Sequence, residues 1–435
     1  MTIRNAGDED VDTYTMCSYA STVPGLTGVQ VAELDLNNRE LGNEMIQSGV
    51  PDASSLPAGA VCTNYALLSP LKKDETRDLV VMTKTTDHVV AYPHERKQLD
   101  APMVLLTVPE TYYSMYEIEE EVTQIRLTSE EGVEKVSGGR AIAQDKEEKS
   151  IVRMETKENV KPFTAGDMKL HVTLAQPLLR ATSVQRDIYV SHWGKIHFRE
   201  LYDVRNEASA IKGEFSRVDF LLNDQGTIGA ALQFQGLMPG GAFDIRYRDE
   251  IGNISTSTVA RNPANELAPI GLGMEPRFPL FGGWHTKFEL SYSISLDWLL
   301  RKSEANGLYE MVFTQGPAIT EVVFENVVTR IHLPEGSNVV DVPKLGNQRD
   351  LQVGSERTFM SVLPRPVVTI KQTNVLVERT LNPSIAEIKY SYQPLLRFDK
   401  LVACALASLV AVKLWQGLAS IELDGGVIAA KVKTA

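Results

Sequence analysis

The chain has 435 residues, of which 43% are hydrophobic and 23% charged, so it is long enough for two or three domains and has the composition of a folded protein. Its 56 acidic and 44 basic residues give a net charge of −12, which repels phosphate backbones and argues against nucleic acid as a partner. Three cysteines are too few for a disulfide framework or a cysteine-based zinc site. For Cys17 and Cys62, a single bridge and two buried free thiols both stay open.

The first third of the chain carries few strong signals. Its opening from Met1 lacks the charged and then apolar pattern of a secretory signal. Residues 37–48 are predicted to form a short helix. Residues 129–159 are polar, which is typical of a long loop or hairpin excursion on the surface. Pro177 is followed by a new strand, and this places a domain boundary near residue 180.

Period-two alternation of apolar and polar residues dominates from about residue 165 to 397, and it predicts strands with one buried and one solvated face. The clearest case is Phe288, Leu290, Tyr292 and Ile294. The same pattern recurs over residues 243–247, 309–313, 327–333 and 388–392. Many short strands separated by turns favour antiparallel β-sandwiches, and the only helix predicted among them covers residues 296–305.

The C-terminal segment is apolar. Residues 401–412 are uncharged, but as a helix they would extend only about 18 Å, against the roughly 30 Å thickness of the hydrocarbon layer. Continuing the helix through Lys413 to Ile421 gives enough length for one crossing, at a cost of about 2.5–3.5 kcal/mol if Lys413 lies at the bilayer centre. The alternative is a buried terminal helix of a soluble protein.

The motifs that usually mark catalysis do not assemble here. Residues 94–98 read HERKQ, so Gln98 stands where the H-E-x-x-H zinc motif needs its second histidine. His192 and His197 are five residues apart and would lie on opposite faces of an extended strand. The chain shows no nucleophile elbow, P-loop or dinucleotide fingerprint. We therefore expect no catalytic residues, no cofactor and no metal.

Asn253 begins the triplet Asn-Ile-Ser, which fits the N-x-[ST] acceptor pattern for N-glycosylation. A three-residue match is a weak signal, and the alternative is an unmodified turn after a strand. A glycan also conflicts with the missing secretory signal, so one of the two inferences must give way.

Three longer motifs resemble the ribophorin I family, whose members are subunit 1 of the oligosaccharyltransferase of the endoplasmic reticulum. They are SHWG at residues 191–194, YRDEIGNISTS at 247–257 and PRFPLFGGW at 276–284. Their order and approximate spacing match the family, and the likeness is clear from about residue 180 to 400.

The resemblance implies a mainly β protein with two luminal antiparallel β-sandwich-like domains followed by a C-terminal transmembrane helix. The expected divisions are an N-terminal luminal domain, a second luminal domain, the membrane helix and a short cytosolic tail, at residues 1–180, 181–398, 399–423 and 424–435. The expected location is the membrane of the endoplasmic reticulum, as a single-pass type I protein with its bulk in the lumen. A signal peptide and a first strand are expected upstream, and we expect that a truncated gene model has left them out.

The resemblance also implies a function, that of a non-catalytic accessory subunit that supports transfer of a dolichol-linked oligosaccharide to Asn of N-x-S/T sequons in nascent proteins. Catalysis is expected in a separate multispanning subunit. The expected partners are that subunit, the other oligosaccharyltransferase subunits and membrane lipid, with the translocon and nascent polypeptides as further candidates and no nucleic acid. A soluble β-sandwich binding or chaperone-like module sharing the fold is the alternative, and a hydrolase with an unrecognised site is the third hypothesis.

The resemblance further implies that Asn253 carries a glycan of the protein's own. The last motif has two interpretations, a packed corner of the second sandwich or an interface with a neighbouring subunit, because aromatic residues serve both uses. Its candidate residues are Arg277, Phe278, Phe281, Gly282, Gly283 and Trp284.

Overall fold

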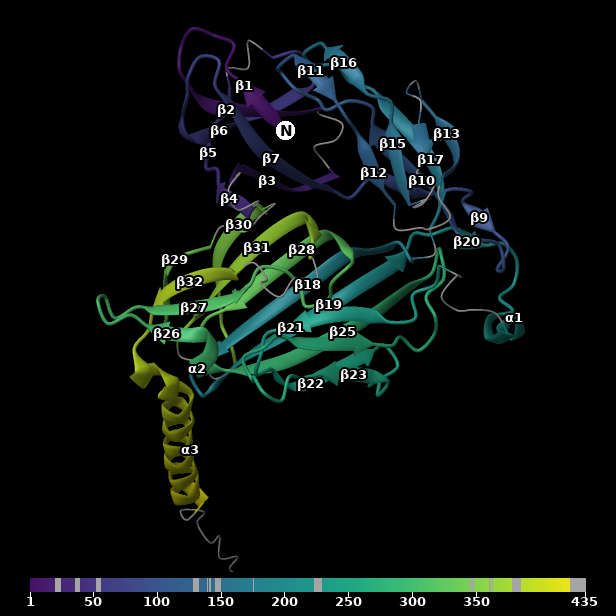
Figure 1. The fold of residues 1–435 in the computed structure, drawn as a ribbon. Coiled ribbons are helices and arrows are strands. Elements are labelled where there is room, and N and C mark those ends of the chain that lie inside the picture. The colour runs from purple at the N-terminus through teal and green to yellow at the C-terminus, as the bar shows by residue number, and fades with distance from the viewer. Residues whose placement is uncertain are drawn as a thin grey trace, which may run out of the picture.

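The structure is a computed structural model that describes residues 1–19, 25–35, 40–51, 56–127, 133–138, 140, 142–144, 150–174, 176–222, 229–343, 345, 348–359, 361, 363–377 and 385–422. The described chain is mainly β and ends in one long helix, α3 (Asp399–Glu422), that projects away from the sheets (Figure 1). The predicted fold class is therefore confirmed. The predicted tail at 424–435 lies outside the described residues.

Two sheets enclose a first hydrophobic cluster near the N-terminus, built around Tyr14, Val31 and Leu79. Cys17 and Cys62 face each other across the paired strands β2 (Val11–Tyr19) and β6 (Ala60–Leu71) and are joined by a disulfide, which decides between the two alternatives left open above. The strands of these sheets, in sheet order, are β1 (Thr2–Arg4), β7 (Thr76–Thr85), β3 (Leu26–Asp35) and β4 (Glu40–Glu44), then β2 (Val11–Tyr19), β6 (Ala60–Leu71) and β5 (Gln47–Gly49).

The helix predicted over residues 37–48 is wrong. This stretch contributes β4 and β5, and β4 pairs antiparallel with β3, with Ala32 opposite Glu44 and Asp35 opposite Glu40. An isolated helix of about 12 residues is marginal in water, so pairing with an existing strand decides the conformation.

A second hydrophobic cluster, around Val152, Met168 and Leu170, is built from residues between 89 and 178. The loop predicted over residues 129–159 is wrong in part, because its described residues include strands, whereas the hairpin alternative holds for β14 and β15. The strands are β13 (Val133–Ser137), β17 (Asp167–Thr173), β10 (Met103–Pro109) and β8 (Val89–Ala91), then β12 (Gln124–Arg126), β15 (Ile151–Met154) and β14 (Ile142–Gln144), and the pair β11 (Ile118–Glu121) and β16 (Lys157–Val160).

A seven-stranded sheet organises the rest of the chain. Its strands pair antiparallel except at the centre, where β18 runs parallel to β28, and the chain between these two supplies other strands of the fold. The predicted boundary near residue 180 coincides with the start of β18 but stays a prediction. In sheet order the strands are β22 (Phe243–Asp249), β25 (His285–Ser295), β19 (Lys195–Asn206), β18 (Leu179–Ser191), β28 (Val323–His332), β31 (Arg365–Leu376) and β30 (Gln348–Glu356).

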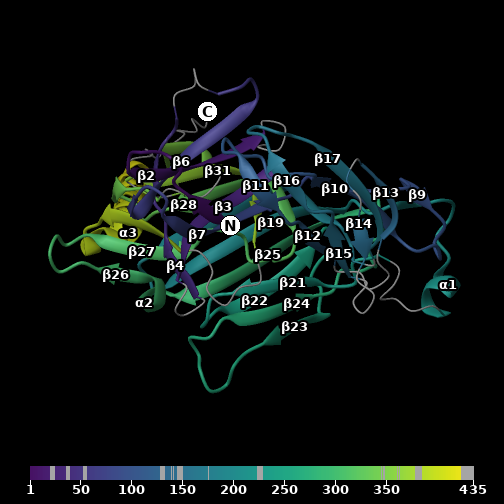
Figure 2. The same ribbon diagram turned by 45° about the horizontal axis from the view of Figure 1, so that its top comes forward.

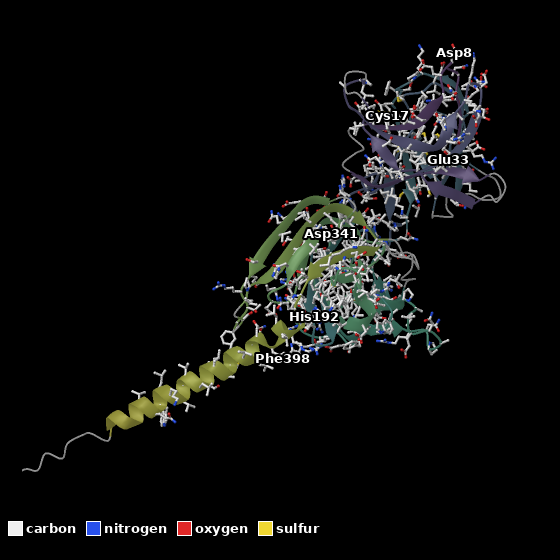
Figure 3. All side chains as sticks on the ribbon, turned by 90° about the vertical axis from the view of Figure 1, so that its left-hand side faces the viewer. Asp8, Cys17, Glu33, His192, Asp341 and Phe398 are labelled. Atoms are coloured by element: carbon white, nitrogen blue, oxygen red, sulfur yellow. A yellow bond between two sulfur atoms is a disulfide. The ribbon has the colours of Figure 1, made fainter. Side chains whose placement is uncertain are left out.

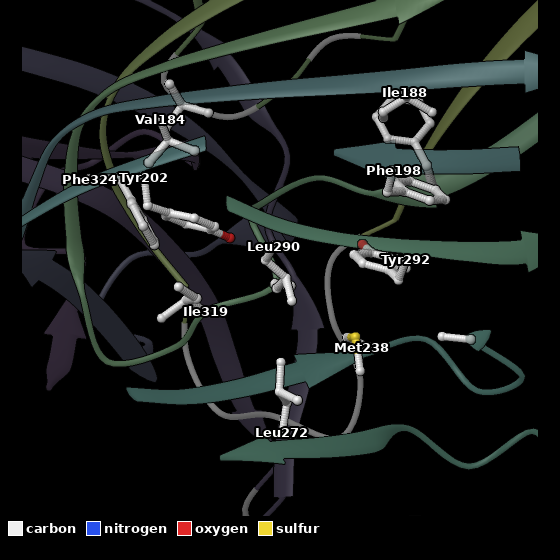
Figure 4. Packing of buried hydrophobic residues seen from close by; sticks show 14 of the residues in the cluster. Val184, Ile188, Phe198, Tyr202, Met238, Leu272, Leu290, Tyr292, Ile319 and Phe324 are labelled. Atoms are coloured by element: carbon white, nitrogen blue, oxygen red, sulfur yellow. The ribbon is translucent and has the colours of Figure 1, made fainter. Parts of the chain in front are cut away.

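One face of this sheet is covered by two smaller sheets. The largest hydrophobic cluster lies between the seven-stranded sheet and these two. Figure 4 shows Leu290 and Tyr292 of β25 facing Leu272 and Met238, which both belong to the three-stranded one of these smaller sheets. The predicted alternation is confirmed in β25, although Ser293 on the opposite face is buried as well, so that face of the strand is covered in part. The covering strands are β21 (Phe234–Met238), β24 (Ile270–Met274) and β23 (Ser257–Ala260), then β26 (Leu300–Lys302), β27 (Tyr309–Thr314), β32 (Ile385–Ser391) and β29 (Asn338–Asp341).

An ion pair is buried inside this apolar core. Arg186 of β18 and Glu200 of β19 are opposite each other, both 0% exposed, with Nε and Oε1 2.9 Å apart. The Arg186 guanidinium also donates to the carbonyl and hydroxyl oxygens of Thr314, at 2.5 and 2.7 Å. Glu200 accepts hydrogen bonds from the Tyr202 hydroxyl and, at 3.0 Å, from the N–H of Ala318. Each charge therefore has several partners, as burial in a core requires.

Helices are short apart from α3. The predicted helix at 296–305 is present only as α2 (Leu296–Leu299), because the chain then enters β26. A six-residue helix, α1 (Arg217–Leu222), lies toward the same end of the molecule as β9 (Glu95–Arg96), which pairs with β20 (Ala210–Ile211) (Figures 1 and 2). At the C-terminal end a 3-10 turn, η4 (Pro394–Phe398), leads into α3 (Asp399–Glu422).

Candidate functional site

Asn253 lies just past the turn that ends β22. The N–H of Asp249 donates to the carbonyl of Gly252 at 3.0 Å and closes this turn. Beyond it, the N–H of Ile254 donates to the carbonyl of Tyr247 at 2.9 Å. Between these two hydrogen bonds, the side chain of Asn253 is exposed to solvent, as an acceptor of a bulky glycan must be.

Arg277 holds this turn closed, although it lies 24 positions further along the chain. Its guanidinium donates two hydrogen bonds to the carboxylate of Asp249, one from Nε and one from Nη2 at 3.0 Å. Nη2 also reaches the carbonyls of Gly252 and Asn253 at 3.3 Å. The hydrogen bond from Arg277 lowers the pKa of Asp249 and in return raises the pKa of Arg277. The structure therefore gives Arg277 a role within the turn that carries the sequon.

A groove of about 390 Å³ opens beside Asn253, on the face of the seven-stranded sheet opposite the core. Arg199 pairs with Glu289 at 2.8 Å, whereas no described carboxylate lies within ion-pair distance of Arg248. The lining is polar and can hydrogen-bond a hydroxyl-rich ligand, such as the innermost sugars of a glycan on Asn253. The groove is lined by His197, Arg199, Asp244, Arg246, Arg248, Asn253, Glu289 and Ser291.

Three aromatic residues of the 276–284 motif join two from the neighbourhood of α1 in one cluster. Phe281 is fully buried, with ring centroids 5.1 Å from Phe215, 5.5 Å from Phe220 and 5.3 Å from Trp284. Phe278 lies 5.9 Å from Trp284 and is 42% exposed. The inner rings are thus packed and the outer ring faces solvent, while a subunit interface at this corner stays a prediction.

The two glycines of this motif are required by a close backbone approach. A Cβ atom on Gly282 would stand 2.1 Å from the carbonyl oxygen of Ser209 and 2.4 Å from that of Ala208. Gly283 has a φ of +79°, in the left-handed region that favours glycine, and its N–H donates to the carbonyl of Asn206 at 2.8 Å. Both positions therefore serve the turn that connects the motif to β25.

Hydrogen bonds connect the segment before α1 to residues 93–98 in the first part of the chain. The side-chain amide of Gln98 exchanges two hydrogen bonds with the backbone of Ser216, both 2.8 Å. The Ser209 hydroxyl donates to the carbonyl of Pro93 at 2.6 Å. Gln98, which departs from the zinc motif, therefore connects segments 118 positions apart.

His192 and His197 do not face a common site. His192 lies in the turn between β18 and β19 and not on an extended strand, with Nε2 3.1 Å from the Tyr390 hydroxyl. Nδ1 of His197 lies 3.1 Å from the hydroxyl of Ser293. Burial, with a further contribution from Arg397, lowers the pKa of His192 to about 4. In the described part of the chain, no three His, Cys, Asp or Glu residues are placed to hold a metal ion.

Sequence reasoning missed the arginines of the groove. Arg246 and Arg248 are two positions apart on β22, which makes them neighbours on one face of a strand that leads directly to the sequon. That spacing is a signal the sequence contains. The contribution of Arg199 depends on the pairing of β19 with β25, which local patterns do not show.

Comparisons with known proteins agree on a family. A family model described as Ribophorin I matches residues 1–415. Dolichyl-diphosphooligosaccharide--protein glycosyltransferase subunit 1A of Arabidopsis thaliana is 29% identical over 386 residues, covering 86% of this chain and 59% of the relative. Subunit 1 of Caenorhabditis elegans is 30% identical over 318 residues, covering 72% of this chain and 52% of the relative. The chain therefore spans between about half and three-fifths of these relatives.

Similarity to solved structures is weak. A crystal structure of an M1 zinc metallopeptidase from Deinococcus radiodurans has a TM-score of 0.24 and 10% identity, covering 50% of this chain and 43% of that one. A likeness at this level supports no statement about function.

Proposed function

The chain belongs to the ribophorin I family, and from this premise we propose that it is a non-catalytic accessory subunit of the oligosaccharyltransferase complex. In that role it supports transfer of a dolichol-linked oligosaccharide to Asn of N-x-S/T sequons, while a separate multispanning subunit performs the reaction. The observation that carries the proposal is the family match over residues 1–415, together with the names of the relatives.

The contacts around the groove support an accessory role. Arg199 pairs with Glu289 and Arg246 pairs with Asp244 at 3.0 Å, so these charges are engaged with each other. Acid–base catalysis needs a proton donor and acceptor directed at one reacting atom. Two of the described cation–carboxylate pairs in the groove are instead directed at each other.

We also propose a location, the membrane of the endoplasmic reticulum, with the sheets in the lumen and the end of the chain in the cytosol. Residues 394–418 are long and apolar enough to cross a bilayer. The Cys17–Cys62 disulfide is typical of an oxidising compartment. Asn253 begins the only N-x-[ST] triplet without proline in the 435 residues, and it is exposed on the part assigned to the lumen.

The exposure of apolar side chains on α3 favours this proposal over a soluble binding module. Leu406, Leu409, Val410 and Leu414 are each more than half exposed, and none of the candidate span is buried against the sheets. A terminal helix of a soluble protein would bury such residues, because about 25 cal/mol is gained per Å² of apolar surface removed from water. The partners that follow are membrane lipid and the other subunits of the complex, with the translocon and nascent chains as further candidates.

An activity assay tests the accessory role. Microsomes depleted of this chain should glycosylate an acceptor peptide more slowly, and adding back the wild-type chain should restore the rate. The control is a triple variant, Leu406→Asp/Leu409→Asp/Val410→Asp, which should fail to restore it because α3 can no longer enter the bilayer. Transfer by the purified chain alone, or full activity without it, would overturn the proposal.

A further inference from the structure

We propose that the tip of the β18–β19 hairpin and the segment entering α3 form a docking surface for the headgroup region of a lipid bilayer. The inference rests on the proposed crossing of the membrane by α3. It goes further by assigning a second, sheet-borne contact with lipid. We call this surface the base surface and define it by Trp193, Phe359, Leu395, Arg397 and Phe398.

The hairpin tip presents a large apolar ring to solvent. Ser191 pairs with Lys195, which leaves a three-residue turn whose middle residue, Trp193, is 61% exposed. Turn tips are usually occupied by small or polar residues. Gly194 has a φ of +109° and supplies the backbone bend, so Trp193 is not needed to form the turn.

Trp193 contacts the residues that lead into α3. Its ring lies edge-to-face against Phe398 with centroids 5.5 Å apart, and the guanidinium of Arg397 lies 5.8 Å from the same ring. Leu395, two positions before Arg397, is 81% exposed. Figure 3 shows His192 and Phe398 at the end of the sheets from which α3 leaves. The exposed side chains of Trp193 and Leu395 therefore lie at the segment that leads into α3.

A third segment reaches the same place. The carboxylate of Glu335 accepts hydrogen bonds from the Thr358 hydroxyl at 3.0 Å and from Nζ of Lys400, in the first turn of α3, at 2.8 Å. Ser361 adds a hydrogen bond to the carboxylate of Asp399 at 3.1 Å. Phe359, between these two contacts, is 89% exposed. Its exposure next to the helix makes it part of the base surface.

The chemistry of the base surface fits a bilayer interface. Tryptophan is enriched at headgroup level because its ring is apolar and its N–H is polar. No described carboxylate lies within ion-pair distance of Arg397, so its charge is available to lipid phosphate, and anionic headgroups attract such cations. The 24 residues of α3 extend about 36 Å, against a hydrocarbon layer of about 30 Å. The first turn of α3, and Trp193 beside it, would therefore lie among the headgroups.

Tryptophan quenching tests the proposal in the full chain. Each variant keeps one of the four tryptophans, at position 193, 284 or 415, with the others replaced by Phe. The variants are reconstituted into vesicles of phosphatidylcholine and phosphatidylserine with brominated acyl chains. Trp193 should lose at least half of its fluorescence relative to unbrominated vesicles. Trp284, in the aromatic cluster at the α1 corner, serves as the unquenched control.

The three tryptophan positions distinguish the docking surface from the crossing of the membrane by α3, on which it rests. Trp415 lies within α3 and reports insertion, so quenching at 415 without quenching at 193 would overturn the docking surface and leave the crossing intact. No quenching at either position would contradict both. Arg397→Gln should weaken quenching of Trp193 on vesicles with phosphatidylserine and leave it unchanged on phosphatidylcholine alone. If the quenching of Trp193 is the same with and without Arg397→Gln on both lipids, Arg397 does not belong to the base surface.

Discussion

Arg186 and Glu200 carry the only fully buried ion pair found among the described salt bridges, and their removal should show how much the central sheet depends on it. Arg186→Met leaves Glu200 buried without its cation, which costs about 3–5 kcal/mol. The double variant Arg186→Met/Glu200→Gln removes both charges and should recover most of the loss.

Hydrogen exchange measures this locally. Amides of β18 and β19 should lose protection in the single variant and regain it in the double variant, while amides of β3, which belong to another hydrophobic cluster, stay unchanged. Equal loss in the single and double variants would show that the pair has no coupling.

Ser255 and Ser257 separate glycosylation from structure. Ser255 provides the hydroxyl of the N-x-[ST] triplet, whereas Ser257 lies two positions beyond it. Ser255→Ala should remove one glycan, seen as a mass that endoglycosidase no longer changes, and Ser257→Ala should keep it. A wild-type chain from microsomes whose mass is insensitive to the enzyme would contradict the assignment of Asn253.

Asp187 predicts a response to acid. Burial alone would raise the pKa of this carboxyl, but the nearby imidazole of His332, 3.6 Å away, and hydrogen bonds from Arg330 and Gln185 outweigh burial and lower it. A lowered pKa in the folded state gives stability that is present above the unfolded value of about 3.9 and is lost as the pH falls below it.

Urea unfolding of wild type and Asp187→Asn, followed between about pH 5 and pH 3, checks this sign. The wild type should lose more stability than the variant over that range, so the difference between the two should narrow steadily as the pH falls. Parallel curves would show that Asp187 does not contribute to the pH dependence.

Among the elements, the turn before β25 depends most on residue size. Gly282→Ala would force a Cβ into the carbonyl oxygens of Ala208 and Ser209, so we expect a loss of about 1–3 kcal/mol or more in the free energy of unfolding. Gly271→Ala in β24 is the matched control, because its Cβ would meet only Ala260 at 3.5 Å. Thermal unfolding should separate the two variants, and equal midpoints would refute the close approach.

Elements with a strong local pattern were predictable. The alternation that predicts β25, β27, β28 and β32 follows from burial of one face, and each strand is found in its expected place. In β22 the same pattern is interrupted, because Asp244 has a φ of +52° and the register shifts there, which leaves Phe243 largely exposed.

Elements decided by distant partners were not predictable. Residues 40–44 become a strand because β3 is available to pair, and β18 meets β28 in parallel although more than a hundred residues separate them. The site divides in the same way. Asn253 is recognised from three consecutive residues, whereas its contact with Arg277 and the groove beside it depend on how β19, β22 and β25 are placed.

At the scale of the whole molecule, the sheets form a body from which one apolar helix extends (Figure 1). The first part of the chain is fastened to the second by β9 with β20 and by Arg180, which pairs with Asp87 at 3.3 Å and with Glu207 at 2.7 Å. The first turn of α3 is held to the sheets by hydrogen bonds of Lys400 with Glu335 and of Asp399 with Ser361. These contacts would hold the sheets next to the membrane if α3 crosses it, as we propose.

Co-purification tests the central claim, membership of the oligosaccharyltransferase complex, most directly. The tagged full-length chain would be extracted from microsomes in a mild detergent, purified, and its partners identified by mass spectrometry. We predict recovery of the catalytic subunit and other subunits of the complex in stoichiometric amounts. Recovery of the chain alone from intact membranes, with the catalytic subunit left in the unbound fraction, would contradict the account.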